Sequence, residues 1–327
     1  MTARRAVFAA IGSALLSGCQ FFFPTPIDQD AEATEPSQVV HAAGSSFEEG
    51  EHIEAEVFLD AVSSGKGTLR VGRRCLADGK TALPIETDAR SIGLATLFGD
   101  ADAETFGLLD PDDNVPLEAH YDVTFNDKRT VTELDFKAGG YRQHQTRYDG
   151  DKPPKDSSRA VTLPTEQTPH DGHSLLGYLR RWEPAPGTRG HLYVIMGRNL
   201  YRTDLLFVGP EVLTTKRGPT KTFRIDGVAT KINEKTLETA KHSPSHPFSL
   251  WMGADEPRVP QRILVESDLA KITIELGNYG KDDLPAADPL PCEKRVDKKA
   301  LAKPPPKPRL RKPGEPVIRP KMPWETD

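Results

Sequence analysis

The chain has 327 residues, of which 36% are hydrophobic and 28% charged, and its formal net charge is −5 at pH 7. A chain of this length can bury one core of roughly 230 residues or two smaller ones. Without residues 1–18 and the basic end at 293–327, the remaining body has a net charge of −13, which excludes nucleic acid as a partner because phosphate contacts need a basic surface.

The N-terminus has the pattern of an export signal. Arg4 and Arg5 precede an apolar run at 6–16, and the sequence Leu-Ser-Gly-Cys follows at 16–19. A membrane-spanning helix needs about 20 apolar residues, so this run is too short for a permanent span. We therefore predict a signal peptide over residues 1–18.

The end of that segment resembles the lipobox of bacterial lipoproteins, in which the cysteine sulfur receives a diacylglycerol and the new amino terminus receives a third acyl chain, such as palmitate. The resemblance assigns lipidation to Cys19, and two or three chains make membrane attachment effectively permanent. In such lipoproteins an aspartate after the cysteine favours the inner membrane, so Gln20 implies the periplasmic side of the outer membrane. The alternative is a plain secreted protein with an incidental cysteine. The polar residues 19–46 are expected to form a flexible linker.

Residues 47–280 show the alternation of a β-rich domain. In 51–60, Ile53, Ala55, Val57 and Leu59 share one face of the predicted strand. A turn at 63–67 leads into a second strand at 68–74. Further strands are predicted at 119–125, 129–136, 139–148, 189–197, 200–209, 210–216, 221–233, 248–253, 258–267 and 270–279. This pattern predicts a mainly β fold, a single curved antiparallel sheet or half-barrel with one or two short helices on its concave side.

Two segments interrupt the strand pattern. Apolar residues recur at helical spacing after the N-cap candidate Asp171, namely Leu175, Leu176, Leu179 and Trp182. A shorter helix is expected within 89–99, with the apolar set Ile92, Leu94, Leu97 and Phe98. Such helices either line the concave side of the sheet or serve only as core.

The chain has few candidates for catalysis. His170 and His173 are three residues apart and could share a metal ion. No second cluster has the required spacing, so we expect a solvated turn there, with metal binding as the alternative. Nucleophile-elbow and Walker motifs are absent from the sequence. We therefore predict no catalytic residues, no resident metal, no cofactor and no enzyme activity.

Two further cysteines, Cys75 and Cys292, remain if Cys19 is acylated. Outside the inner membrane thiols are oxidised, so we expect these two to form a disulfide, with two buried free thiols as the alternative. Residues 281–327 are rich in proline, lysine and arginine, which predicts a disordered extended tail. The tail either contacts an acidic partner, such as lipid headgroups, a cell-wall polymer or a proline-reading protein, or is simply solvated.

Four stretches carry a family resemblance: SSFEEGEHIEAEVFLDAVSSGKGTLRV, DGHSLLGYLRRWEPAPG, VGPEVLTTKRGPTKTFRIDGV and LWMGADEPRVPQRILVESDLAKITIEL. Their matching elements are Gly50 with Glu51, the helix residues Asp171, Leu175, Tyr178 and Arg180, and the hairpin at 250–260. In this order they resemble the DUF-3108 family of exported Gram-negative proteins without an assigned activity, over residues 47–279. The resemblance implies an envelope β protein and, more loosely, a curved sheet like that of the Lol lipoprotein carriers.

These features favour an outer-membrane-anchored periplasmic module that binds a hydrophobic ligand, such as a lipid acyl chain, between sheet and helix. The candidate lining residues are Leu175, Leu179, Trp182, Phe207 and Trp251, which could equally form a sealed core. One alternative is a scaffold that docks an envelope protein or the cell wall through its acidic body and basic tail. The other is a metal-dependent hydrolase built on His170 and His173.

Overall fold

The computed structural model describes residues 38–39, 46–97, 99–165, 167–240, 243, 245–266, 271–282 and 292. The predicted signal peptide, Cys19, nearly all of the linker and the tail at 293–327 lie outside the described residues. Among the described helices, none is both long and apolar enough to cross a membrane.

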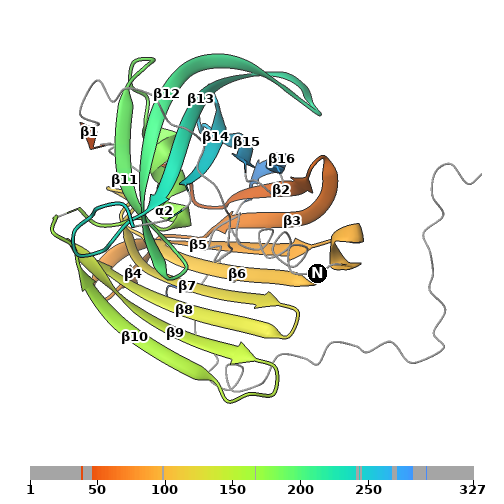
Figure 1. Cartoon of the computed structure of the whole chain (residues 1–327). Coiled ribbons are helices and arrows are strands. Elements are labelled where there is room, and N and C mark those ends of the chain that lie inside the picture. The colour runs from red at the N-terminus through yellow and green to blue at the C-terminus, as the bar shows by residue number, and fades with distance from the viewer. Residues whose placement is uncertain are drawn as a thin grey trace, which may run out of the picture.

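One large curved sheet forms the domain (Figure 1). Its strands follow the order β1-β11-β12-β13-β14-β15-β16-β2-β3-β5-β6-β7-β8-β9-β10, with β4 paired to β5 outside this path. Neighbours are antiparallel except β1 and β11, which are parallel. The strand bounds are β1 (Gln38–Val39), β2 (Glu51–Leu59), β3 (Val62–Val71), β4 (Cys75–Ala77), β5 (Lys80–Ser91), β6 (Ala101–Leu109), β7 (Pro116–Phe125), β8 (Lys128–Lys137), β9 (Gly140–Asp149), β10 (Lys155–Thr162), β11 (Arg189–Met196), β12 (Asn199–Thr215), β13 (Gly218–Lys231), β14 (Ser245–Gly253), β15 (Pro260–Glu266) and β16 (Lys271–Lys281). The predicted curved antiparallel sheet is confirmed.

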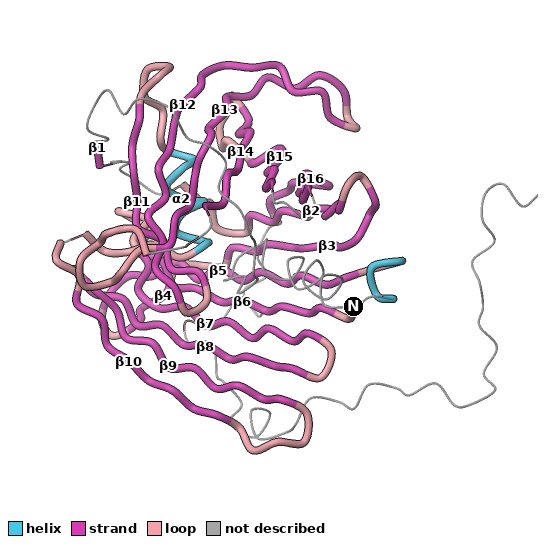
Figure 2. The backbone as a smooth tube through the Cα atoms, in the orientation of Figure 1, coloured by secondary structure: helices cyan, strands magenta, loops and turns pink. Residues whose placement is uncertain are grey.

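The two ends of the sheet meet through side chains. Among the described strands, no backbone ladder joins β10 to β1 or β11. Tyr141 and Val161 from one end pack in the same buried cluster as Tyr193 and Ile195 from the other. We call this contact the seam. Its polar margin includes an ion pair of 2.6 Å between Arg159 and Glu234. Figure 2 shows the resulting open, strongly curved strand layer.

The helix α2 (Gly172–Arg181) lies on the concave side of the sheet (Figure 1). Its predicted N-cap is confirmed, since Asp171 and Ser174 exchange hydrogen bonds in a capping box. Leu179 packs into a buried cluster with β11 to β14, whereas Leu176 contacts a second cluster formed by β2, β3, β5 and β6. The helix therefore joins two regions of the curved sheet.

The structure adds five strands that the sequence pattern did not predict, β1, β4, β5, β6 and β10, and β1 lies within the segment 19–46 that was expected to be a flexible linker. The expected helix within 89–99 was placed wrongly: β5 continues to Ser91, and only a short 3₁₀ helix, η2 (Gly93–Leu97), follows. The segments 200–209 and 210–216 belong to the one long strand β12, with an irregularity between Phe207 and Gly209 where Gly209 has a φ of 117°. Glycine tolerates this positive φ, so the strand bends there without ending.

Cys75 and Cys292 form a disulfide with a Cα–Cα distance of 5.7 Å, which confirms the predicted pair. The bond attaches Cys292 to the strand β4, ten residues beyond Asp282, the last residue described before it. The beginning of the basic tail is therefore fixed beside the first part of the sheet.

Candidate functional site

A buried polar cluster lies at the beginning of α2. Asp171, His173 and Ser174 are all 0% exposed. The Oδ1 atom of Asp171 accepts hydrogen bonds from the backbone N–H of Ser174 at 2.8 Å and from its hydroxyl at 2.7 Å. The other carboxylate oxygen accepts from the Tyr121 hydroxyl at 3.1 Å. The cap thus also binds the helix to β7, the strand that carries Tyr121.

His173 extends this cluster to two more strands. Its Nε2 atom lies 3.0 Å from the Thr87 hydroxyl and 3.3 Å from the Thr105 hydroxyl. Its Nδ1 atom lies 3.9 Å from Asp171, and a Cβ atom on Gly107 would approach it to 2.8 Å. Gly107, which is on β6, therefore leaves the space that the His173 imidazole occupies.

Burial sets the protonation of these groups. It lowers the pKa of the His173 ring, with a smaller opposing effect from the Asp171 carboxylate. Burial, together with that carboxylate, raises the pKa of the Tyr121 hydroxyl well above its ordinary value. At neutral pH the cluster consequently contains a neutral imidazole and a neutral phenol around one carboxylate, an arrangement that positions the helix.

His170 lies in the same buried region. Its ring is 4.8 Å from that of Tyr178, and burial lowers its pKa to about 4, against a small opposing effect of Asp171. The expectation of a solvated turn at His170 and His173 was wrong, because both side chains are buried by the sheet and the helix. Within the described part of the chain, no three potential ligands come together in a group that could hold a metal ion.

A buried ion pair fixes the other end of α2. The Arg180 guanidinium lies 2.7 Å from the Glu51 carboxylate, and the two side chains are 1% and 0% exposed. Arg180 also donates to the Pro257 carbonyl at 2.6 and 3.0 Å and lies over the Phe47 ring at 4.8 Å. Burial raises the pKa of the Glu51 carboxyl, and the guanidinium opposes this shift. The pair connects the helix to β2 and to the loop before β15.

An apolar cavity of about 70 Å³ lies beside α2, and we call it the inner cavity. Leu176 forms its wall on the helix side, and the sheet side comes from β2, β3, β5, β15 and β16. The Thr87 hydroxyl at its margin is already bonded to His173. The lining residues are Ile53, Ala55, Gly67, Thr68, Leu69, Thr87, Leu176, Pro260, Arg262, Ile263, Ile274 and Leu276.

A buried apolar cluster continues past the inner cavity along the concave side. Val57 and Leu59 of β2 cluster with Ile272 and Ile274 of β16, and Val265 of β15 packs against them. These positions alternate along their strands with polar residues such as Glu56 and Thr273, as expected of a strand with one apolar face. The inner cavity is therefore one end of a longer apolar strip.

The five predicted lining residues have other positions. Leu179, Trp182 and Phe207 belong to a single buried cluster, with Leu175 packed against it. Trp251 alternates with the inward-facing Leu250 and Met252, so it lies on the opposite face, with the Arg224 guanidinium 5.3 Å from its ring. Its indole N–H has no hydrogen-bond acceptor among the described residues. The structure thus joins four of the five residues as core, and none of them lines the inner cavity.

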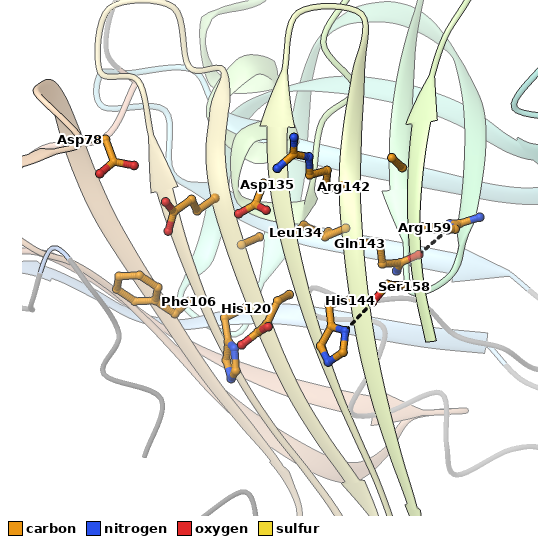
Figure 3. A pocket seen from close by; sticks show the side chains of 14 residues that line it. Asp78, Phe106, His120, Leu134, Asp135, Arg142, Gln143, His144, Ser158 and Arg159 are labelled. Atoms are coloured by element: carbon orange, nitrogen blue, oxygen red, sulfur yellow. Dashed lines mark hydrogen bonds between the residues drawn. The ribbon is translucent and has the colours of Figure 1, made fainter. Parts of the chain in front are cut away.

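A larger polar depression occupies the face opposite α2, across β6 to β10 (Figure 3). Its volume is about 790 Å³, and we call it the outer groove. Ala119 and Tyr121 point into the seam cluster, so the alternate residues Glu118 and His120 point outward. The lining residues are Asp78, Phe106, Glu118, Ala119, His120, Glu133, Leu134, Asp135, Arg142, Gln143, His144, Ser158, Arg159 and Ala160.

Two solved structures that the comparison found have low sequence identity to this chain. A β-barrel-like protein of the domain of unknown function DUF1849 from Brucella abortus is 9% identical, covers 76% of this chain and 100% of its own, and has a TM-score of 0.43. A putative exported protein with a YmcC-like fold from Bacteroides fragilis is 9% identical, with coverages of 73% and 100% and a TM-score of 0.31. No curated protein matches the chain.

The match to a sequence family is more extensive. The family described as protein of unknown function DUF3108 matches residues 54–277, which is 224 of the 327 residues. The matched region begins within β2 and ends within β16, so it includes α2, the polar cluster and every lining residue of the inner cavity except Ile53. The chain belongs to the DUF3108 family.

Proposed function

We propose that the protein is a noncatalytic envelope module that binds the end of an apolar chain, such as a lipid acyl chain, in the inner cavity. The observation that supports this most directly is the composition of the lining, in which aliphatic side chains from α2, β2, β3, β15 and β16 converge on a space of about 70 Å³. Apolar lining with few polar groups is typical of sites for apolar ligands.

The size of the inner cavity limits what it holds. A single water molecule needs a cavity of roughly 10–15 Å³. The inner cavity therefore holds a few methylene groups and not a whole lipid. Each buried methylene contributes about 0.8 kcal/mol. Useful affinity therefore requires more of the ligand to be buried. The neighbouring strip is closed, because Val57, Leu59 and Ile272 are 0%, 7% and 4% exposed, so η2, which contributes Ala95 to the same cluster, has to move aside before a longer chain can enter.

A noncatalytic function agrees with the state of the polar cluster. Asp171, His173 and Tyr121 include an acid, a base and a hydroxyl, but their side chains are bonded to one another and to threonines inside the core. The predicted signal peptide and the resemblance of residues 16–19 to a lipobox ending at Cys19 support placement at the outer membrane, where acyl chains are the abundant apolar ligands.

Native mass spectrometry of protein purified without added lipid tests the proposal. We expect a copurifying lipid, and displacement of a fluorescent fatty acid by dodecanoate in solution. Ala55→Phe should fill the inner cavity and weaken fatty-acid binding at least tenfold, because Ala55 lines it. The matched control Val212→Phe adds the same ring at a position 64% exposed and should leave binding unchanged.

Two results would overturn the proposal. Equal fatty-acid affinity in the wild type and Ala55→Phe would show that the inner cavity is not the site. An empty protein that fails to bind fatty acid and retains a partner or stoichiometric zinc would favour the docking scaffold or the hydrolase, respectively.

A further inference from the structure

The outer groove has an excess of carboxylates. Asp78, Glu118, Glu133 and Asp135 line it together with two arginines, Arg142 and Arg159. The Arg159 charge is already paired with Glu234 at the seam. Among the described residues, no ion pair engages Asp78, Glu133 or Asp135. The groove therefore presents negative charge to a ligand on the outer face of the sheet (Figure 3).

The disulfide brings a basic segment to one end of this groove. Cys75 packs against the cluster of Ala82, Phe106 and Leu108, and Phe106 is itself a groove residue. Asp78, three residues after Cys75, also lines the groove. Because Cys292 is bonded to Cys75, the chain that continues from Cys292 starts at the Asp78 and Phe106 end.

The sequence after Cys292 is complementary in charge. Residues 293–299 read EKRVDKK, with four cations, Lys294, Arg295, Lys298 and Lys299, and two acids. The groove crosses five strands from β6 to β10, which at about 4.8 Å between neighbours is roughly 19 Å. An extended chain covers this distance in about six residues. The length from 294 to 299 matches the span.

We propose that residues 294–299 of this same chain bind across the outer groove, with their basic side chains at Glu118, Glu133 and Asp135. The disulfide makes the contact intramolecular, which raises the effective concentration of the segment to the millimolar range. The charges are accessible to solvent, so the contact weakens as salt shortens the Debye length. The rest of the tail, from 300 to 327, stays available to other partners.

Limited trypsin digestion of the oxidised full-length chain tests this, because the tail contains its own reference site. In low salt we expect cleavage after Arg295 and Lys299 to be at least fivefold slower than cleavage after Arg309. The triple variant Glu118→Gln, Glu133→Gln, Asp135→Asn should remove this protection, as should 0.5 M NaCl. The matched control Asp113→Asn, Glu211→Gln, Glu238→Gln changes three exposed carboxylates elsewhere and should retain it.

Carbodiimide crosslinking of mixed ¹⁴N and ¹⁵N protein distinguishes the occupants. Links from Lys294, Lys298 or Lys299 to groove carboxylates that never join a ¹⁴N peptide to a ¹⁵N peptide support the proposal. If about half of the linked pairs in an equal mixture were of mixed isotope, the groove would hold the tail of a second copy, and the proposal would be overturned. Equal trypsin cleavage in the wild type and the groove variant would also overturn it. Fatty-acid binding should be unchanged in the groove variant, so this proposal and the proposed function fail independently.

Discussion

His170 and His173 show how the surroundings of a residue decide its chemistry. Both were candidates for a metal site from their spacing, yet both rings lie inside the core, and burial lowers the pKa of each. The neighbouring Asp171 carboxylate opposes the shift by a smaller amount. A folded-state pKa below the unfolded value means that the unfolded chain binds more protons, so acid favours unfolding.

The first prediction concerns this pH dependence. The pKa of His170 is about 4 in the folded protein and 6.5 ordinarily. Its contribution to the free energy of unfolding is therefore complete above pH 6.5 and is lost as the pH falls toward 4. At pH 5 the loss from His170 is about 2 kcal/mol, with a further loss in the same direction from His173. Urea unfolding at pH 7.5 and at pH 5 measures this loss of unfolding free energy.

A phenylalanine at position 170 provides the comparison. His170→Phe keeps a ring beside Tyr178 and retains the backbone bonds to β11, but it does not titrate. The difference in unfolding free energy between the two pH values should shrink by about 2 kcal/mol. The control His144→Phe, at an exposed position, should leave this difference in unfolding free energy unchanged. An unaltered pH dependence in His170→Phe would contradict the assignment.

Residue patterns predicted some of these positions and missed others. The N-cap at Asp171 was predictable because capping is local, between residues three apart. The partner of Arg180 was not, since Glu51 is 129 positions away and only the folded sheet brings it to the helix. Two indications were present in the sequence. Glu51 and Arg180 were both among the positions that carry the family resemblance, and Arg180 follows Leu176 by four residues, on the same helix face.

At the scale of elements, the close packing of α2 yields the second prediction. A Cβ atom on Gly177 would lie 2.7 Å from the Ser46 hydroxyl and 2.8 Å from the Phe47 ring. Alanine gains up to about 1 kcal/mol in helix propensity, but overpacking costs about 1–3 kcal/mol. We expect Gly177→Ala to lower the free energy of unfolding by about 1–2 kcal/mol, measured in urea.

A double variant tests the reason for that loss. Ser46→Ala removes the oxygen closest to the new methyl group, so its combination with Gly177→Ala should be less destabilising than the sum of the single changes. Strict additivity, or a stabilised Gly177→Ala, would show that the helix has room to move away from residues 46 and 47.

Strand prediction succeeded where one face is buried and failed elsewhere. The strand β2 alternates clearly because its inner face packs in the core. The edge strand β10 is polar almost throughout, with seven of its eight residues outside the buried class. In β5, four consecutive residues from Ala82 to Ile85 are buried, because β4 and Phe106 cover the outer face as well. Alternation cannot mark strands that have no solvated or no buried face.

At the scale of the whole molecule, the sheet is held in its curve by the seam and by α2. The clusters on the concave side contain residues from strands far apart in the chain, such as Tyr141 of β9 with Ile195 of β11 and Ile232 after β13. The sequence predicted a curved sheet, but nothing local in it specifies which strands form the ends or how these meet. That depends on contacts across the completed fold.

The last prediction concerns the seam itself. Tyr141 is 0% exposed in the seam cluster, and its hydroxyl donates to Glu234 at 2.7 Å. Truncating a buried aromatic costs about 3–5 kcal/mol, so Tyr141→Ala should loosen both ends of the sheet. Hydrogen exchange should then accelerate in β9 and β10 and also in β11 and β12, which are joined to them by side chains alone. Tyr148→Ala is the matched control, because Tyr148 is on the same strand but faces outward under Arg129. If both variants accelerated exchange only in β8 to β10, the seam would not connect the two ends of the sheet. The curvature of the sheet would then be held by α2 alone.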